Sequence, residues 1–217
     1  GAGDPHPRNL ASPASAGARR QRAMLADLVA VIDPEHCESL AERLLAEHRT
    51  LGRLFSQSPE ALARTLGKDS TVGAMLVAAH RATLEAMREE LSGRGIDPDN
   101  PKLLRYLRAS MGALPDEALR VLFLDPSHRL IADEQLQRGT LGHLAVYPRT
   151  IFRRAIELDA AAIILVHNHP SGDPAPSRFD IEATERLATI GQALDVEVLE
   201  HILSLIHISE PTRRTPI

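Results

Sequence analysis

Residues 160–180 read AAAIILVHNHPSGDPAPSRFD, and they predict a strand, a loop and the first turn of a helix in direct succession. The apolar, partly β-branched residues 160–166 are typical of a buried strand. Residues 170–176 are rich in Pro and contain Gly, so they can continue neither a strand nor a helix and predict a loop. Ser177 is then expected to cap a helix that carries Asp180 in its first turn.

Three side chains of this stretch are candidate metal ligands. Side chains on a strand alternate between its faces, so His167 and His169 should project to the same side. Asp180, at the start of the following helix, can approach the same point. Two imidazole nitrogens, one carboxylate oxygen and a fourth position filled by water form the ligand set of a catalytic zinc site. The sequence therefore predicts Zn²⁺ bound by His167, His169 and Asp180.

Two simpler interpretations compete with the metal site. Ser177 and Asp180 fit a capping box, in which the acid only satisfies backbone donors at a helix start. Two His residues in a loop can also form a solvated polar turn. Capping, however, does not require two His residues at the end of an apolar strand. The letters His-Asn-His also match the name of a nuclease class, whose named residues we expect from separated positions on a ββα unit.

The spacing His-x-His-x7-Ser-x2-Asp resembles the JAMM motif of the JAB/MPN metalloprotease superfamily, and residues 167–177 are similar to its bacterial RadC branch. The resemblance extends over roughly residues 104–203. It implies an α/β fold with a JAB/MPN-like mixed sheet flanked by helices, preceded by a small all-α domain of the helix-hairpin-helix type. Further matching segments are residues 121–125, 130–131, 139–140 and 146–149.

The resemblance also implies the roles of individual residues. It makes His167, His169 and Asp180 the zinc ligands. Ser177 is expected to donate a hydrogen bond to the oxygen that develops charge during attack, an interaction that typically lowers the barrier by about 3 kcal/mol.

The resemblance further implies a general base, a glutamate from an earlier strand that takes a proton from the zinc-bound water. Glu117 lies just before the first apolar strand and is the first candidate; Glu134, after the second strand, is the second. A solvated acid at the start of a strand is the alternative interpretation of Glu117. The expected reaction is hydrolysis of an amide, often an isopeptide bond, in an unknown peptide or isopeptide substrate. A non-catalytic RadC-like interaction module associated with DNA repair or replication is the alternative function.

Composition limits the class of protein. Of 217 residues, 43% are hydrophobic, which is enough for a packed core. Cys37 is the single cysteine, so a disulfide framework is excluded, and this residue is expected to lie in the core. No apolar run is long enough for a membrane span and no signal peptide is visible, so we expect a cytoplasmic protein without a membrane partner. The net charge of −4 gives no general attraction to nucleic acid. Histidines outside the motif, including His201, show no ligand spacing and are expected to be surface or helix residues.

The chain is expected to divide into five segments. Residues 1–18 should be disordered and residues 19–91 should form a helical domain. A linker at 92–101 and the JAB/MPN domain at 102–202 follow. Residues 203–217 look like the in-frame translation of a transposon-type sequencing adapter, so we expect a non-native tail that replaces the true end of the domain.

The helical domain contains a helix-hairpin-helix-like turn at residues 66–73. Only one glycine lies in the expected tight turn, and Asp69 adds a negative charge where a DNA phosphate would bind. DNA is therefore a weakly supported partner, and a packing role is favoured. Two further departures from the RadC pattern are Thr150, where Glu is usual, and Glu200-His201, where Asp-His is usual.

The alternation of elements in the second domain can also be predicted. Helices are expected at about 102–111, 150–158 and from Ser177, and strands from Leu119, near Arg129, at 160–166 and at 196–199.

Overall fold

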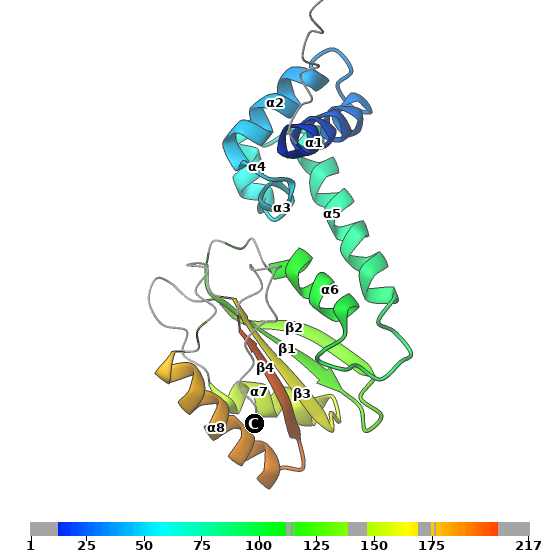
Figure 1. Cartoon of the computed structure of the whole chain (residues 1–217). Coiled ribbons are helices and arrows are strands. Elements are labelled where there is room, and N and C mark those ends of the chain that lie inside the picture. Colours follow the sequence, from blue (N-terminus) through cyan, green and yellow to red (C-terminus); the bar gives the residue numbers. More distant parts are fainter. Residues whose placement is uncertain are drawn as a thin grey trace, which may run out of the picture. The chain divides into compact units, whose positions relative to one another are not determined.

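The computed structural model describes residues 13–111, 114, 116–138, 147–168, 175 and 177–203 (Figure 1). The chain divides into two compact units, Gly1–Val77 and Ala78–Ile217. The boundary lies inside a helix, α5 (Thr71–Glu89).

The first unit is a helical bundle, as expected. Its helices are α1 (Pro13–Ala30), α2 (Cys37–His48), α3 (Leu51–Phe55), α4 (Pro59–Leu66) and the start of α5. Their apolar faces meet in one core that includes Leu25, Leu44, Leu54 and Leu76, against which Cys37 packs half-buried. Thr50 and Ser58 cap α3 and α4 through their side-chain oxygens, which accept hydrogen bonds from backbone N–H groups.

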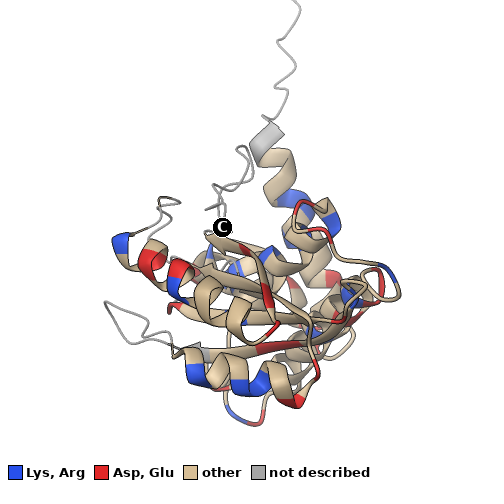
Figure 2. Ribbon diagram, turned by 90° about the horizontal axis from the view of Figure 1, so that it is seen from below, with Lys and Arg blue, Asp and Glu red and all other residues tan. Residues whose placement is uncertain are grey.

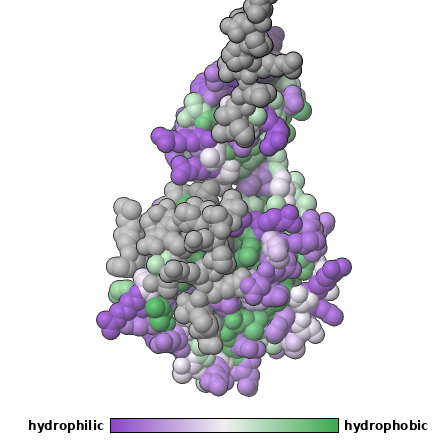
Figure 3. All heavy atoms as spheres, viewed as in Figure 1, coloured by the Kyte–Doolittle hydropathy of each residue, from purple (hydrophilic) through white to green (hydrophobic). Residues whose placement is uncertain are grey.

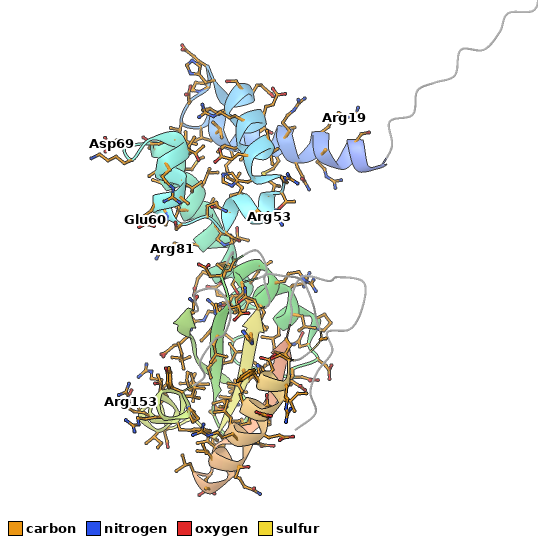
Figure 4. The ribbon with its side chains drawn as sticks, turned by 90° about the vertical axis from the view of Figure 1, so that its left-hand side faces the viewer. Arg19, Arg53, Glu60, Asp69, Arg81 and Arg153 are labelled. Atoms are coloured by element: carbon orange, nitrogen blue, oxygen red, sulfur yellow. The ribbon has the colours of Figure 1, made fainter. Side chains whose placement is uncertain are left out.

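The predicted disorder of residues 1–18 is wrong from Pro13 onward, because α1 begins there. Proline suits the first helical position, since its missing N–H has no partner there in any helix, and the alanines that follow favour helix. Residues 1–12 lie outside the described residues. The turn between α4 and α5 is present where the hairpin was expected, with Gly67 at a φ of 91° and Asp69 on the turn (Figure 4).

The second unit is built on a mixed sheet, as predicted. Within the described residues the strand order is β2-β1-β3-β4, with β1 antiparallel to both neighbours and β3 parallel to β4 (Figure 1). The strands are β1 (Ala118–Leu124), β2 (Leu130–Arg138), β3 (Ala162–Asn168) and β4 (Glu197–Leu203). The helices are α6 (Pro101–Met111), α7 (Pro148–Glu157) and α8 (Arg178–Ala193), besides the end of α5.

Helices cover both faces of this sheet. Leu122 of β1 and Ile164 of β3 pack in a core shared with α6, whereas Val121 and Leu165 pack in a second core shared with α7 and α8. Every residue of β3 is buried, as expected for a strand with neighbours on both sides. Because side chains alternate, His167 lies on the same face as Leu165, toward α8.

A β-bulge changes the direction of the side chains in β4. Val198 is paired with Ile163, but the next pair is Glu200 with Ile164, so Leu199 is the extra residue. As a result His201, paired with Leu165, lies on the face covered by α8.

The segment at 92–101, expected to be a linker, is part of the second unit and packs into its core. Ile96 is buried and donates its backbone N–H to the carbonyl of His128 at 2.7 Å, and Gly95 forms a β-bridge with Arg129. At the other end of the chain, Leu203 is the buried last residue of β4, and residues 204–217 of the predicted tail lie outside the described residues.

On the face shown in Figure 3, green apolar residues lie among purple hydrophilic ones. None of the helices among the described residues is both long and apolar enough to cross a bilayer. Acidic and basic residues are intermixed along the elements visible in Figure 2. The exposed large apolar residues are Met24, Val31, Ile32, Ile131, Tyr147, Ile156, Phe179 and Leu194.

A polar cluster lies between α6 and the sheet. The Tyr106 hydroxyl donates a short hydrogen bond to Asp133, and Arg120 Nε lies 3.3 Å from the other oxygen of that carboxylate. Burial raises the pKa of the Tyr106 phenol above its usual value, and the negative charge of Asp133 raises it further. The phenol therefore stays a hydrogen-bond donor to a carboxylate that is only 3% exposed.

Removing this donor should destabilise the second unit. We expect Tyr106→Phe to lower the free energy of unfolding by about 1–3 kcal/mol, because a buried carboxylate loses a hydrogen bond. Urea denaturation measures the change. Tyr147→Phe is the control, since Tyr147 is 59% exposed and should tolerate the same change. Equal stability of the two variants would contradict the prediction.

Helix α8 approaches β4 closely at Gly191. A Cβ atom at this position would lie 2.3 Å from the carbonyl oxygen of Val196, so only glycine fits. We expect Gly191→Ala to lower the free energy of unfolding by about 1–3 kcal/mol through overpacking. The exposed neighbour Gln192 provides the control, because Gln192→Ala should change stability by about 0.5 kcal/mol or less. Thermal unfolding of both variants checks the difference.

Candidate metal centre

The candidate site begins at the end of β3. His167 is the next-to-last residue of the strand and is 6% exposed. Its backbone is paired with Leu119 of β1, and its side chain faces the start of α8. The apolar run of β3 therefore carries an imidazole to the edge of the core without exposing it.

Asp180 is brought to the same place by the start of α8. Ser177 caps the helix by accepting a hydrogen bond from the Asp180 N–H at 3.1 Å. In return, Asp180 Oδ2 accepts bonds from the Ser177 N–H at 2.8 Å and from the Ser177 hydroxyl at 2.6 Å. The capping box considered from the sequence is thus present, and its bonds to the carboxylate fall on one oxygen.

The other oxygen of Asp180 faces His167. Oδ1 lies 3.1 Å from His167 Nδ1, and the carboxylate is only 9% exposed. Capping and the contact with His167 use different oxygen atoms, so the two interpretations of Asp180 are compatible. A nitrogen and an oxygen on a tetrahedral zinc ion at bond lengths of about 2.0–2.1 Å would be about 3.3 Å apart. The observed separation is close to this value, so these two donors fit the ion.

The other expected ligand, His169, lies outside the described residues, as do residues 170–174 and 176 of the predicted loop. Among the residues that the structure describes, no group of three His, Cys, Asp or Glu side chains is placed to hold a metal ion. The described part of the chain therefore contains two members of the predicted ligand set, His167 and Asp180, in contact with each other.

Glu117 lies on the opposite side of the His167 ring from Asp180. Its Oε2 atom is 3.9 Å from His167 Nε2, and its side chain is 30% exposed. The carboxylate is thus close to the imidazole and still accessible to water.

Asn168 fixes the chain on both sides of Glu117, a role that was not predicted from the sequence. Its amide oxygen accepts a hydrogen bond from the Ala118 N–H at 2.7 Å, and its amide nitrogen donates to the Asp116 carbonyl at 3.1 Å. Asn168 is 1% exposed. Alternation turns Asn168 toward the face of β3 opposite to His167, and this face is also buried. A buried amide requires hydrogen-bond partners, so an Asn at the end of an apolar strand could have indicated such a role.

Glu134 is held by a different element. Arg154 of α7 donates to both of its oxygens, at 2.7–3.0 Å, and this hydrogen bonding lowers the pKa of Glu134 below its usual value. Glu134 of β2 is paired with Val121 of β1. Val121 is in turn paired with Leu165 of β3 and not with His167. Of the two candidate bases, Glu117 is therefore the one next to the His167 ring.

The expected position of His201 at the surface or in a helix is wrong. His201 lies in β4 and is 2% exposed, because the bulge at Leu199 turns it toward α8. Its ring is stacked with that of His167, with centroids 6.2 Å apart and planes inclined by 17°. Its Nδ1 lies 2.5 Å from the hydroxyl of Thr184, which is also buried.

Known proteins resemble this chain in sequence. Residues 99–206 match the family model described as a RadC-like JAB domain. A UPF0758 protein of Rhodobacter capsulatus is 40% identical over 164 residues, which are 76% of this chain and 77% of that protein. A UPF0758 protein of Leptothrix cholodnii is 44% identical over 169 residues, which are 76% of this chain and 74% of that protein.

The role of Asn168 can be tested by removing its amide. We expect Asn168→Ala to lower the free energy of unfolding by about 2 kcal/mol or more, since two backbone groups beside Glu117 lose their partners. Gln135→Ala, which removes an exposed amide from β2 of the same sheet, should have little effect. Chemical denaturation measures the free energy of unfolding of both variants. If Asn168→Ala loses no more stability than Gln135→Ala, Asn168 is dispensable for the fold.

Proposed function

The chain belongs to the RadC family, and we propose that its JAB domain is a zinc-dependent hydrolase that cleaves amide or isopeptide bonds. The observation that carries the proposal is the position of His167 between two carboxylates. Asp180 Oδ1 lies 3.1 Å from one nitrogen of the ring, and Glu117 Oε2 lies 3.9 Å from the other.

The residues that would hold the ion are His167, Asp180 and His169. A bound zinc ion supplies a Lewis acid and lowers the pKa of a bound water from about 15.7 to about 7. Ser177 prepares Asp180 for this role, because its N–H and hydroxyl bind Oδ2 and thereby direct Oδ1 toward His167.

Glu117 is the general base of the proposed reaction. Its carboxylate takes a proton from the attacking water as the water oxygen bonds to the scissile carbonyl carbon. It then transfers this proton to the amide nitrogen as the carbon–nitrogen bond breaks, which gives a carboxylic acid and an amine. The 30% exposure of Glu117 leaves room for water and substrate beside it.

Ser177 has a second role in this proposal, as donor to the oxygen of the scissile carbonyl. Its single hydroxyl proton is directed at Asp180 Oδ2 in the structure, so the hydroxyl must rotate when substrate binds. The Ser177 N–H, 2.8 Å from the same oxygen, continues to hold Asp180 during this rotation.

Turnover by matched variants tests the proposal. Purified full-length chain with added Zn²⁺ would be assayed on a panel of fluorogenic peptide and isopeptide amides. We expect Glu117→Gln to lower kcat by about 10²–10⁴-fold, since it removes the base without changing size. Glu134→Gln is the matched control and should keep its activity within a few fold. Equal turnover by the wild type and Glu117→Gln would exclude Glu117 as the base.

Zinc binding separates the proposed hydrolase from a non-catalytic module. Glu117→Gln should still bind one zinc ion, whereas His167→Ala should lose it, because only the latter removes a ligand. Equilibrium dialysis with metal analysis measures the stoichiometry. A wild type that binds zinc but hydrolyses none of the panel would favour the interaction module, and a wild type that binds no zinc would refute the proposal.

A further inference from the structure

Two buried polar residues near the site have no part in the proposed chemistry. Thr184 of α8 and His201 of β4 are each 2% exposed, although both have polar side chains. Buried polar groups persist in folded proteins when hydrogen bonds compensate for the loss of water. The bonds of these two residues lead to the backbone of Asp180.

The direction of each bond can be assigned from the number of protons. The Thr184 hydroxyl lies 2.6 Å from the Asp180 carbonyl oxygen, which can only accept, so the single hydroxyl proton points there. The hydroxyl oxygen must then accept from His201 Nδ1, 2.5 Å away. His201 therefore carries a proton on Nδ1, and a chain of donors runs from His201 through Thr184 to Asp180.

A bond from a threonine hydroxyl to the carbonyl four residues earlier is common in helices and does not by itself indicate a role. Thr189 of the same helix makes such a bond to the carbonyl of Glu185 at 3.0 Å, on the exposed side. Thr184 differs because its hydroxyl also accepts from a residue of another element. This link ties the first turns of α8 to the sheet beside His167.

His201 is connected to both of the described candidate ligands. It reaches Asp180 through Thr184, and its ring is stacked with the ring of His167 at a centroid distance of 6.2 Å. The bulge at Leu199 is required for this position, because regular alternation from Val198 would turn Glu200 toward α8 instead.

We propose that Thr184 and His201 are positioning residues of the candidate metal centre. They fix the main chain of Asp180, and thereby hold its carboxylate beside His167 at the separation that one ion requires. This inference rests on the proposed zinc site. Outer partners that orient metal ligands in this way typically change metal affinity about 10–100-fold when they are removed.

Zinc affinity of threonine variants provides the first test. The dissociation constant would be measured on the full chain by competition with a chromophoric chelator. We expect Thr184→Val to weaken binding at least about 10-fold, whereas Thr184→Ser, which keeps the hydroxyl, should stay near the wild type. Thr189→Val is the matched control on the same helix and should have no effect. Equal affinities of all four proteins would overturn the inference and leave the proposed zinc site intact.

Variants of His201 test the other end of the chain. His201→Asn can still donate from a position near that of Nδ1, and should keep more zinc affinity than His201→Leu. Co²⁺ in place of Zn²⁺ adds a spectroscopic measurement, because its visible absorption depends on ligand geometry. We expect an altered Co²⁺ spectrum in Thr184→Val and His201→Leu and an unaltered one in Thr189→Val. Unaltered spectra in all variants would contradict a positioning role.

Loss of folding must be separated from loss of positioning. Leu187→Ala removes a buried side chain from the same helix and should destabilise the protein without changing the zinc affinity of its folded fraction. If Leu187→Ala weakens zinc binding as much as Thr184→Val does, general destabilisation explains the effect and the inference is wrong.

Hydrogen exchange in metal-free protein distinguishes failure of this inference from failure of the proposed function. We expect the backbone amides of the first two turns of α8 to exchange faster in Thr184→Val and His201→Leu than in Thr189→Val, because the link to β4 is lost. Equal exchange in the three variants would overturn the inference. Absence of zinc binding by the wild type would instead overturn the proposed function, and with it the assignment of these residues to a metal site.

Discussion

The burial of the Asp180 carboxylate is the constraint on which the rest of the site depends. A carboxylate that is largely removed from water is costly unless its oxygens have partners. Here one oxygen is bound by the cap of α8 and the other faces an imidazole of β3. This arrangement requires the first turn of the helix to lie against the end of the strand. At the far end of the helix, Gly191 allows a close contact with Val196, the residue before β4.

Local patterns in the sequence were sufficient for much of this fold. The apolar run at 160–166 predicted β3, and Ser177 predicted the start of α8, because strand alternation and helix capping involve residues close in the chain. The mixed α/β sheet expected from the family resemblance is confirmed. The wrong prediction of disorder up to residue 18 arose from composition alone, since Pro13 at the first helical position and the Ala residues that follow it also suit the start of a helix.

The surroundings of the candidate site depend on pairing between distant segments, and this could not be predicted from the sequence. His201 showed no ligand spacing, and its position near His167 follows from the register of β4 against β3. Asn168 stands between two candidate ligands, yet its partners come from residues about 50 positions earlier. The family resemblance favoured Glu117 over Glu134 as the base, but it did not predict that Arg154, on a later helix, holds Glu134.

After the extra residue Leu199, the alternation of side chains in β4 is shifted by one position relative to helix α8. Val198 and His201 both face it, although they are three positions apart. Loss of Leu199 in the course of evolution would restore regular alternation and leave Val198 and His201 two positions apart, both still facing α8. If the strand instead kept its length and lost the bulge, Glu200 would face the helix and His201 would turn away, so an acidic side chain would replace the imidazole without any substitution.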